Sequence, residues 1–156
     1  MNTINLLLNS KVFYGLANED INIILPLLYS QQFEKNKTIF NENEQGNAMY
    51  FIIDGSVKII KKIDNTRTKT LSQLKTGDCF GEMSLIDGNI RSAGAVTVRD
   101  TTLAILTKEA FDSIIKAHPE ISSKILMNLA KILTNRLREA DEQILDILSF
   151  HFQGNK

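Results

Sequence analysis

The stretch of residues 80–93 reads FGEMSLIDGNIRSA and carries more chemical information than any other part of the chain. It begins with Gly81 and Glu82, and it ends with Arg91 followed by small residues. Residues 82–86 predict one helical turn, and the Asp-Gly-Asn after them predicts a loop. The stretch therefore combines a glycine, a carboxylate and a guanidinium within one short helix and loop.

These residue types suit a ligand that carries both a ribose and a phosphate. Arg91 offers a fork of N–H donors that stays charged and matches a phosphate. Gly81 allows backbone to approach a ligand closely, and the helix start beyond it adds N–H donors. Glu82 can accept a hydrogen bond from a 2′-hydroxyl, whereas a deoxyribose would leave this carboxylate unpaired. The Glu–Arg pair alone is explained better by a structural ion pair than by a ligand site. The order of the residues around the pair therefore has to decide between the two.

That order resembles the phosphate-binding cassette of the cyclic-nucleotide-binding domain family. The family's cassette reads approximately Phe-Gly-Glu, an apolar residue, a small residue and Leu, then a variable loop and Arg-(Ser/Thr/Ala)-Ala. Residues 80–85 and 91–93 match every fixed position, and the segment 50–57 (YFIIDGSV) is similar to the family's strand–turn–strand. The resemblance covers essentially the whole chain. One departure is Asn43, where the family usually has Gly; Asn tolerates positive φ, so we expect the turn to remain.

The resemblance implies a site and a ligand. Glu82 takes the ribose role and Arg91 the phosphate role, while neighbouring positions offer backbone or hydroxyl contacts and two strand positions wall the pocket. The expected ligand is a cyclic mononucleotide, cAMP first and cGMP as the alternative, with no metal ion. The complete set of expected ligand-binding residues is Gly81, Glu82, Met83, Arg91, Ser92, Ala93, Ile59, Leu71, Phe80 and Asp141.

The last helix is expected to choose the base. In bacterial activators of the family this helix closes over the base and forms the dimer interface. Ala140 and Asp141 align with hydroxyl residues that contact adenine in those activators, and Ala140 cannot make such a bond. Asp141 can accept hydrogen bonds from the amine of adenine or from N1 and N2 of guanine. A solvated helix charge explains Asp141 about as well.

The chain is predicted to form a single domain, 1–156, of the α+β class with mainly β structure. Residues 1–28 read as helical, and residues 107–150 are helical again. Residues 29–106 contain short strands, which by resemblance form an eight-stranded antiparallel β-roll, a jelly-roll-like double-stranded β-helix. Strands are expected at 38–40, 48–53, 56–63, 68–74, 91–98 and 102–106, with a tight hairpin turn at Asp54-Gly55.

Local signals refine the helical zones. Asn18 is expected to cap a helix whose apolar stripe ends at Leu28, with a break near Pro26. Thr107 is expected to cap the first C-terminal helix, and Pro119 fits the first turn of the second. The flanking helices therefore comprise an N-terminal group and a long C-terminal helix.

The long helix, 120–148, is apolar on more than one side, which exceeds what contact with one small domain requires. A homodimer through this helix, and an effector protein, are therefore the expected partners. The activators of the family continue into a DNA-binding domain, for which a chain that ends at Lys156 is too short. The expectation is a stand-alone sensor that signals through ligand-dependent movement of the helix and does not bind DNA directly.

Composition narrows the function classes. Lys plus Arg equals Asp plus Glu at 18 each, so no global field favours a nucleic acid or an anionic membrane. Cys79 is the only cysteine, which fits a reducing compartment. No apolar run has the length of a membrane span, and the N-terminus lacks the features of a signal peptide. The default expectation is a cytoplasmic protein.

Two alternatives stay open besides cGMP. A cupin-like enzyme on a similar β architecture would need clustered His and Glu in its strands, but the strands contain no His, and His118 and His151 lack metal-ligand spacing. A degenerate family member would bind no nucleotide and would mediate only protein contacts. Its expected signature, loss of the Glu or the Arg of the cassette, is missing from the sequence. No enzymatic activity is expected.

Overall fold

The structure is a computed structural model of the 156-residue chain and describes residues 7, 10–64 and 66–153. Helical elements stand at both ends of a run of eight strands, and one short helix is inserted among the strands. The helical elements are η1 (Lys11–Phe13), α2 (Asn18–Ile24), η2 (Leu25–Leu27), α3 (Glu82–Asp87), α4 (Lys108–Ala117) and α5 (Pro119–Gln153).

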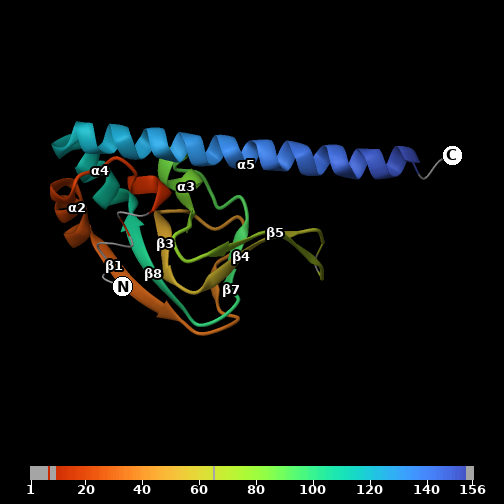
Figure 1. The fold of residues 1–156 in the computed structure, drawn as a ribbon. Helices are drawn as coiled ribbons and strands as arrows, with labels where there is room; N and C mark the ends of the chain where they lie inside the picture. Colours follow the sequence, from red (N-terminus) through yellow and green to blue (C-terminus); the bar gives the residue numbers. More distant parts are fainter. Residues whose placement is uncertain (1–6, 8–9, 65, 154–156) are drawn as a thin grey trace.

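The eight strands form two antiparallel four-stranded sheets, which confirms the predicted β-roll. One sheet has the strand order β1–β8–β3–β6 and the other has the order β2–β7–β4–β5. The strands are β1 (Leu28–Phe33), β2 (Thr38–Phe40), β3 (Ala48–Asp54), β4 (Ser56–Lys62), β5 (Thr68–Lys75), β6 (Cys79–Phe80), β7 (Gly94–Thr97) and β8 (Thr101–Thr107). In Figure 1, α5 runs along one side of the roll and projects beyond it, and the β4–β5 hairpin projects in the same direction.

The core has two parts, which lie on opposite faces of β3. Successive strand residues point to opposite faces, so Phe51 packs with the helices while Ile52 packs inside the roll. The helix side of the core also contains Ile125 and Leu129 of α5. These contacts fix the first half of α5 on the roll, and the long helix of 35 residues then continues past the core.

Two predicted turns are confirmed by the backbone. Gly55 joins β3 to β4 with φ 125°, and a Cβ at this position would lie 2.3 Å from Oγ1 of Thr101. Asn43 has φ 69°, so asparagine supports the left-handed turn where the family usually has glycine. The tight hairpin and the turn before the cassette therefore form as the sequence indicates.

Several predicted boundaries at the N-terminal side were wrong. Asn18 is the first residue of α2, whereas the cap position belongs to Ala17, whose N–H donates to Oδ2 of Asp20 at 3.0 Å. Leu28 does not end a helical stripe; it opens β1 and pairs with Leu106. The middle of β1 is exposed and polar, which removed the alternation that would have revealed it. Residues 1–6, 8 and 9 of the predicted helical segment lie outside the described residues.

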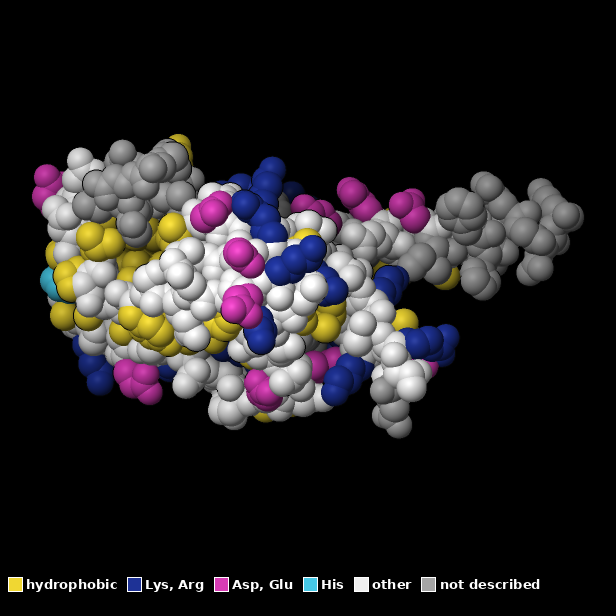
Figure 2. All heavy atoms as spheres, turned by 90° about the horizontal axis from the view of Figure 1, so that it is seen from below, with side chains coloured by type: hydrophobic (Ala, Val, Ile, Leu, Met, Phe, Trp, Pro, Cys, Tyr) yellow, Lys and Arg dark blue, Asp and Glu magenta, His cyan; other side chains and the backbone are white. Residues whose placement is uncertain are grey.

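Within the strand zone the differences are smaller. The two-residue strand β6 was missed, and β7 is shorter than the predicted strand 91–98 because Arg91 and the two residues after it belong to an irregular segment. On the face shown in Figure 2, basic and acidic side chains are interspersed. No helix within the described residues is both long enough and apolar enough to cross a bilayer.

Candidate functional site

The cassette takes the predicted form of a helix and a loop. Gly81 follows β6 with a left-handed backbone, φ 77° and ψ 8°, and α3 begins at Glu82. A Cβ on Gly81 would lie 2.7 Å from Nη1 of Arg91 and 3.1 Å from the carbonyl oxygen of Ala48. Glycine is therefore required here both by the backbone conformation and by the room that the Arg91 guanidinium occupies.

The Arg91 side chain is only 3% exposed, and it is held by neutral groups. Its Nη1 donates to the Gly81 carbonyl at 3.0 Å and its Nη2 to the Ala48 carbonyl at 2.8 Å. Its Cζ lies 4.2 Å from the ring centroid of Phe40, a cation–π contact. Burial lowers the pKa of Arg91 from its ordinary value, but an arginine stays protonated in a protein.

Arg91 thus carries a buried charge that lacks an anionic partner. Among the described residues, no carboxylate forms an ion pair with Arg91, and its Nε is buried without a hydrogen-bond acceptor. A buried cation is costly unless an anion pairs with it. The site is therefore suited to an anionic ligand.

Glu82 is 2% exposed, and its two oxygens have different surroundings. Oε1 accepts a hydrogen bond of 2.5 Å from Nη1 of Arg136, which lies on α5. Nη2 of the same arginine donates to the Cys79 carbonyl at 2.6 Å. Oε2 is buried and has no donor among the described residues. One oxygen of the carboxylate is therefore held by the last helix, and the other can accept from a ligand hydroxyl.

A cavity of about 630 Å³ lies between the cassette, β4, β5 and α5. This volume falls within the range of roughly 300–1,000 Å³ that is typical of small-molecule sites. The structure brings nearly all of the expected residues together around it: Gly81, Glu82, Met83, Arg91, Ser92, Ala93, Ile59, Leu71 and Phe80. Asp141 is exposed and does not line this cavity. The roles of these residues in ligand binding stay predictions.

Sequence reasoning placed the last helix at the base and named Ala140 and Asp141, but it missed most of the residues through which α5 walls the cavity. This helix contributes Leu133, Arg136, Leu137, Glu139, Ala140 and Gln143. The missed signal is helical spacing, because residues three, four and seven positions apart share one face. Counting back and forward from Ala140 gives Arg136, Leu137 and Gln143, whereas Asp141 is turned about 100° away.

The loop that carries Arg91 is fixed by the strands beside it. Nζ of Lys61 donates to the Ser92 carbonyl at 2.7 Å and pairs with Oε1 of Glu42 at 2.9 Å. The Asn43 N–H donates to the Arg91 carbonyl at 2.9 Å. The positive φ of Asn43 therefore places a turn that anchors the cassette. Hydrogen bonds from the Lys62 N–H and from Lys61 hold the pKa of Glu42 below its ordinary value.

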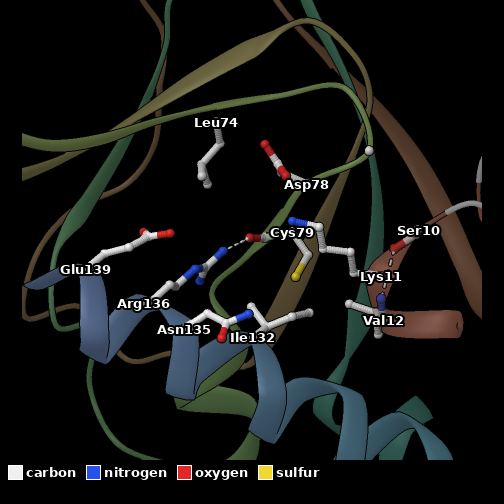
Figure 3. Close-up of a pocket in the computed structure, with 11 residues that line it drawn as sticks. Ser10, Lys11, Val12, Leu74, Asp78, Cys79, Ile132, Asn135, Arg136 and Glu139 are labelled. Atoms are coloured by element: carbon white, nitrogen blue, oxygen red, sulfur yellow. Dashed lines mark hydrogen bonds between the residues drawn. The ribbon is translucent and has the colours of Figure 1, made fainter.

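Figure 3 shows a second, smaller cavity of about 200 Å³, which shares lining residues with the first. It is bounded by η1, the turn before β6 and α5, and Arg136 and Glu139 line both cavities. Figure 3 shows the Arg136 guanidinium directed at the backbone of Cys79. The Cys79 thiol is 3% exposed, and burial raises its pKa to about 12. Arg136 therefore connects the ligand cavity with the N-terminal elements.

Comparisons with known proteins agree with this geometry. The family described as "Cyclic nucleotide-binding domain" matches residues 30–118. The Thermus thermophilus protein named "Cyclic AMP receptor protein" is 37% identical over 147 residues, which cover 94% of this chain and 66% of that protein. The chain thus spans slightly less than two thirds of the length of this curated relative.

Solved structures show the same fold. The crystal structure of Thermus thermophilus catabolite activator protein has a TM-score of 0.78 at 38% identity, covering 90% of this chain and 64% of that chain. A cyclic nucleotide-binding domain from Methylobacillus flagellatus has a TM-score of 0.82 at 29% identity, covering 92% and 80%.

The family match extends over more than half of the chain and includes the whole cassette together with β2 to β8. It therefore contains the buried Glu82 and Arg91 and the strands that wall the cavity. This family comprises regulatory binding domains and not enzymes, which agrees with the expectation from sequence. The chain belongs to the family of cyclic nucleotide-binding domains.

Proposed function

We propose that this chain is a sensor that binds cAMP in the 630 Å³ cavity and passes the signal on through α5. One observation carries the proposal: within the described part of the chain, a buried cation without an ion-pair partner and a buried carboxylate oxygen without a donor line the same cavity. A cyclic mononucleotide supplies a phosphate for Arg91 and a 2′-hydroxyl for Glu82. A single ligand of this class thus satisfies both groups.

The preference for cAMP rests on the comparisons, because the similar Thermus thermophilus protein is named a cyclic AMP receptor protein. The alternative ligand is cGMP, and one feature of the cavity favours it. Glu139 lines the cavity, and its carboxylate can accept hydrogen bonds from the N1 and N2 donors of guanine.

Transmission through α5 is supported by the residues that this helix places at the cavity. A ligand shifts a conformational equilibrium only through contacts that differ between the two states. Leu133, Leu137 and Ala140 offer such contacts, and Arg136 donates to Oε1 of Glu82. A ligand that engages Glu82 therefore acts on the same carboxylate as the helix. That the sensor signals on its own, without a DNA-binding domain, stays a prediction.

We infer that α5 also forms a homodimer. The distal half of the helix exposes Leu137, Ile144, Leu145 and Leu148, with Leu145 65% exposed. A second copy of the helix would remove these side chains from water. Light scattering of the wild type should give the mass of a dimer, and Leu145→Glu should give a monomer at the same concentration. A wild type that stays monomeric at every practical concentration would refute the dimer.

Isothermal titration calorimetry with cAMP and cGMP tests the binding proposal. The wild type should bind cAMP, Arg91→Leu should bind it at least about 100-fold more weakly because a desolvated phosphate loses its charged partner, and cGMP should bind less tightly. Arg99→Leu is the matched control, since Arg99 is exposed and pairs with the exposed Asp54. Circular dichroism verifies that each variant is folded.

Two results would contradict the proposal. One is the lack of heat and of any thermal shift for the wild type with either nucleotide at millimolar concentration. The other is a folded Arg91→Leu variant that binds as tightly as the wild type. If that variant does not fold, Glu82→Gln takes its place, because it conserves the size of the side chain and removes only the charge.

A further inference from the structure

Among the described residues of α5 that line the cavity, one has a neutral polar side chain, and it is Gln143. The remaining residues of this set are Leu133, Leu137 and Ala140, which offer no hydrogen-bonding group, and the charged Arg136 and Glu139. Arg136 is already engaged by Glu82 and by the Cys79 carbonyl. The amide of Gln143 is therefore the neutral polar group that α5 offers to a ligand in the cavity.

The position of Gln143 along the helix relates it to the far end of a bound nucleotide. Arg136 marks the height of Glu82, the expected ribose partner. Seven residues of α-helix advance about 10 Å, which places the Gln143 backbone beyond the sugar in the direction that leads away from the cassette. Helical side chains lean toward the N-terminus and cover the preceding turn, so we expect the Gln143 side chain to lie over Ala140.

The small side chain of Ala140 leaves room for the side chain of Gln143 beside it. The Ala140 side chain is a single methyl group, so it fills little of the cavity wall and can make no polar contact with a base. Asp141, the next residue, is exposed and lies outside the cavity. The two positions that align with base-contacting residues of the family's activators therefore provide no polar group to the cavity within this chain.

We propose that Gln143 reads the base edge of the bound nucleotide. This assignment rests on the proposed function and specifies its base-recognition residue. A glutamine amide has a donor and an acceptor side by side, and it matches the N6 amine and N7 of adenine in a bidentate pair. Glu139 has only acceptor oxygens when ionised and cannot make this pair.

The test compares cAMP with the 3′,5′-cyclic monophosphate of purine riboside, in which hydrogen replaces the 6-amino group. Calorimetry gives the ratio of the two dissociation constants for the wild type, for Gln143→Leu, for Asp141→Asn and for the control Glu142→Gln, whose position is exposed and does not line the cavity. The wild type should prefer cAMP by about fivefold or more, as expected for one neutral hydrogen bond. Gln143→Leu should bring the ratio close to one, and the control Glu142→Gln should leave it as in the wild type.

The possible failures are distinguishable. A wild type that binds neither ligand contradicts the proposed function, and the assignment of Gln143 with it. A wild type that binds both equally, or a Gln143→Leu variant that keeps the full preference, overturns the assignment alone. Loss of the preference in Asp141→Asn but not in Gln143→Leu also overturns it, and it gives the base-reading role to Asp141.

Discussion

Nη1 of Arg136 donates to Oε1 of Glu82 at 2.5 Å, although 54 residues separate the two in the sequence. The bond joins the last helix to the first residue of α3 at the wall of the cavity. The Arg136 side chain is 34% exposed and the Glu82 side chain is 3% exposed, so the carboxylate depends on the arginine more than the reverse. Any movement of α5 therefore changes the electrostatic surroundings of the expected ribose partner.

Replacement of Arg136 should destabilise the fold through Glu82. Arg136→Met leaves both oxygens of a buried carboxylate without a donor, which is expected to cost about 1–3 kcal/mol of the free energy of unfolding. Glu82→Gln should restore part of the loss in the double variant, because the buried charge is gone. Urea denaturation at neutral pH measures both effects. Arg138→Met, two residues along the helix at an exposed position, is the control. If Arg136→Met and Arg138→Met lost equal amounts of the free energy of unfolding, the role of the ion pair would be contradicted.

The free oxygen of Glu82 should distinguish ribose from deoxyribose. The wild type is expected to bind cAMP about tenfold or more tightly than 2′-deoxy-cAMP, since the deoxy ligand leaves the buried Oε2 unpaired. Glu82→Leu should bind both ligands with similar affinity. Competition with a fluorescent cyclic nucleotide measures the four dissociation constants. If the wild type does not distinguish the two ligands, Glu82 does not contact the 2′-hydroxyl.

Gly81 should be less tolerant of alanine than Gly77. Both residues have positive φ, 77° for Gly81 and 91° for Gly77, so both substitutions strain the backbone. Only at Gly81 would the new Cβ meet other atoms, at 2.7 Å from Nη1 of Arg91. Gly77→Ala should therefore cost about 1 kcal/mol, while Gly81→Ala should cost more and should also weaken nucleotide binding. Thermal unfolding and calorimetry together measure this difference. Equal effects on stability and binding would show that Gly81 matters only for its backbone.

The cassette and most strands could be predicted because their signals are local. A glycine after a strand, a hairpin turn at Asp54-Gly55 and alternating apolar residues each act within a few positions. The strand β1 was missed because only its two end residues, Leu28 and Phe33, are partly buried, and the four residues between them are exposed. Its pairing with β8 is a contact between distant parts of the chain, which no local pattern encodes.

The site was predicted in the same uneven way. Arg91 and Glu82 lie within ten residues of each other in the sequence, and the motif that contains both predicted them. The α5 wall depends on how a distant helix is rotated against the roll, and this rotation is set by the packing of Ile125 and Leu129 in the core. A rotation of one residue, about 100°, separates Ala140 from Asp141. Sequence alignment could identify which turn of the helix lies near the cavity, but it could not identify which face of that turn lines the cavity.

Cys79 should be unreactive in the native protein at neutral and mildly alkaline pH. The thiolate is the reactive form, and burial raises the pKa of this thiol from 9.0 to about 12. At pH 8 the thiolate fraction is then on the order of 10⁻⁴, against about 10⁻¹ for an ordinary thiol. Because the unfolded chain loses this proton more readily than the native one, the thiol also makes stability fall as the pH rises from about 9 toward 12.

Reaction with a disulfide reagent such as dithionitrobenzoate measures this directly, since Cys79 is the only cysteine of the chain. The native protein at pH 8 should react at least about 100-fold more slowly than the same protein in urea, because both the thiolate fraction and access to the sulfur are low. Arg136→Met is an informative comparison, as Arg136 binds the Cys79 carbonyl and closes one side of the smaller cavity. Faster labelling of that variant without loss of helical content would show that the arginine holds α5 over the thiol, whereas equal rates for the native and the unfolded wild type would contradict the burial of Cys79 altogether.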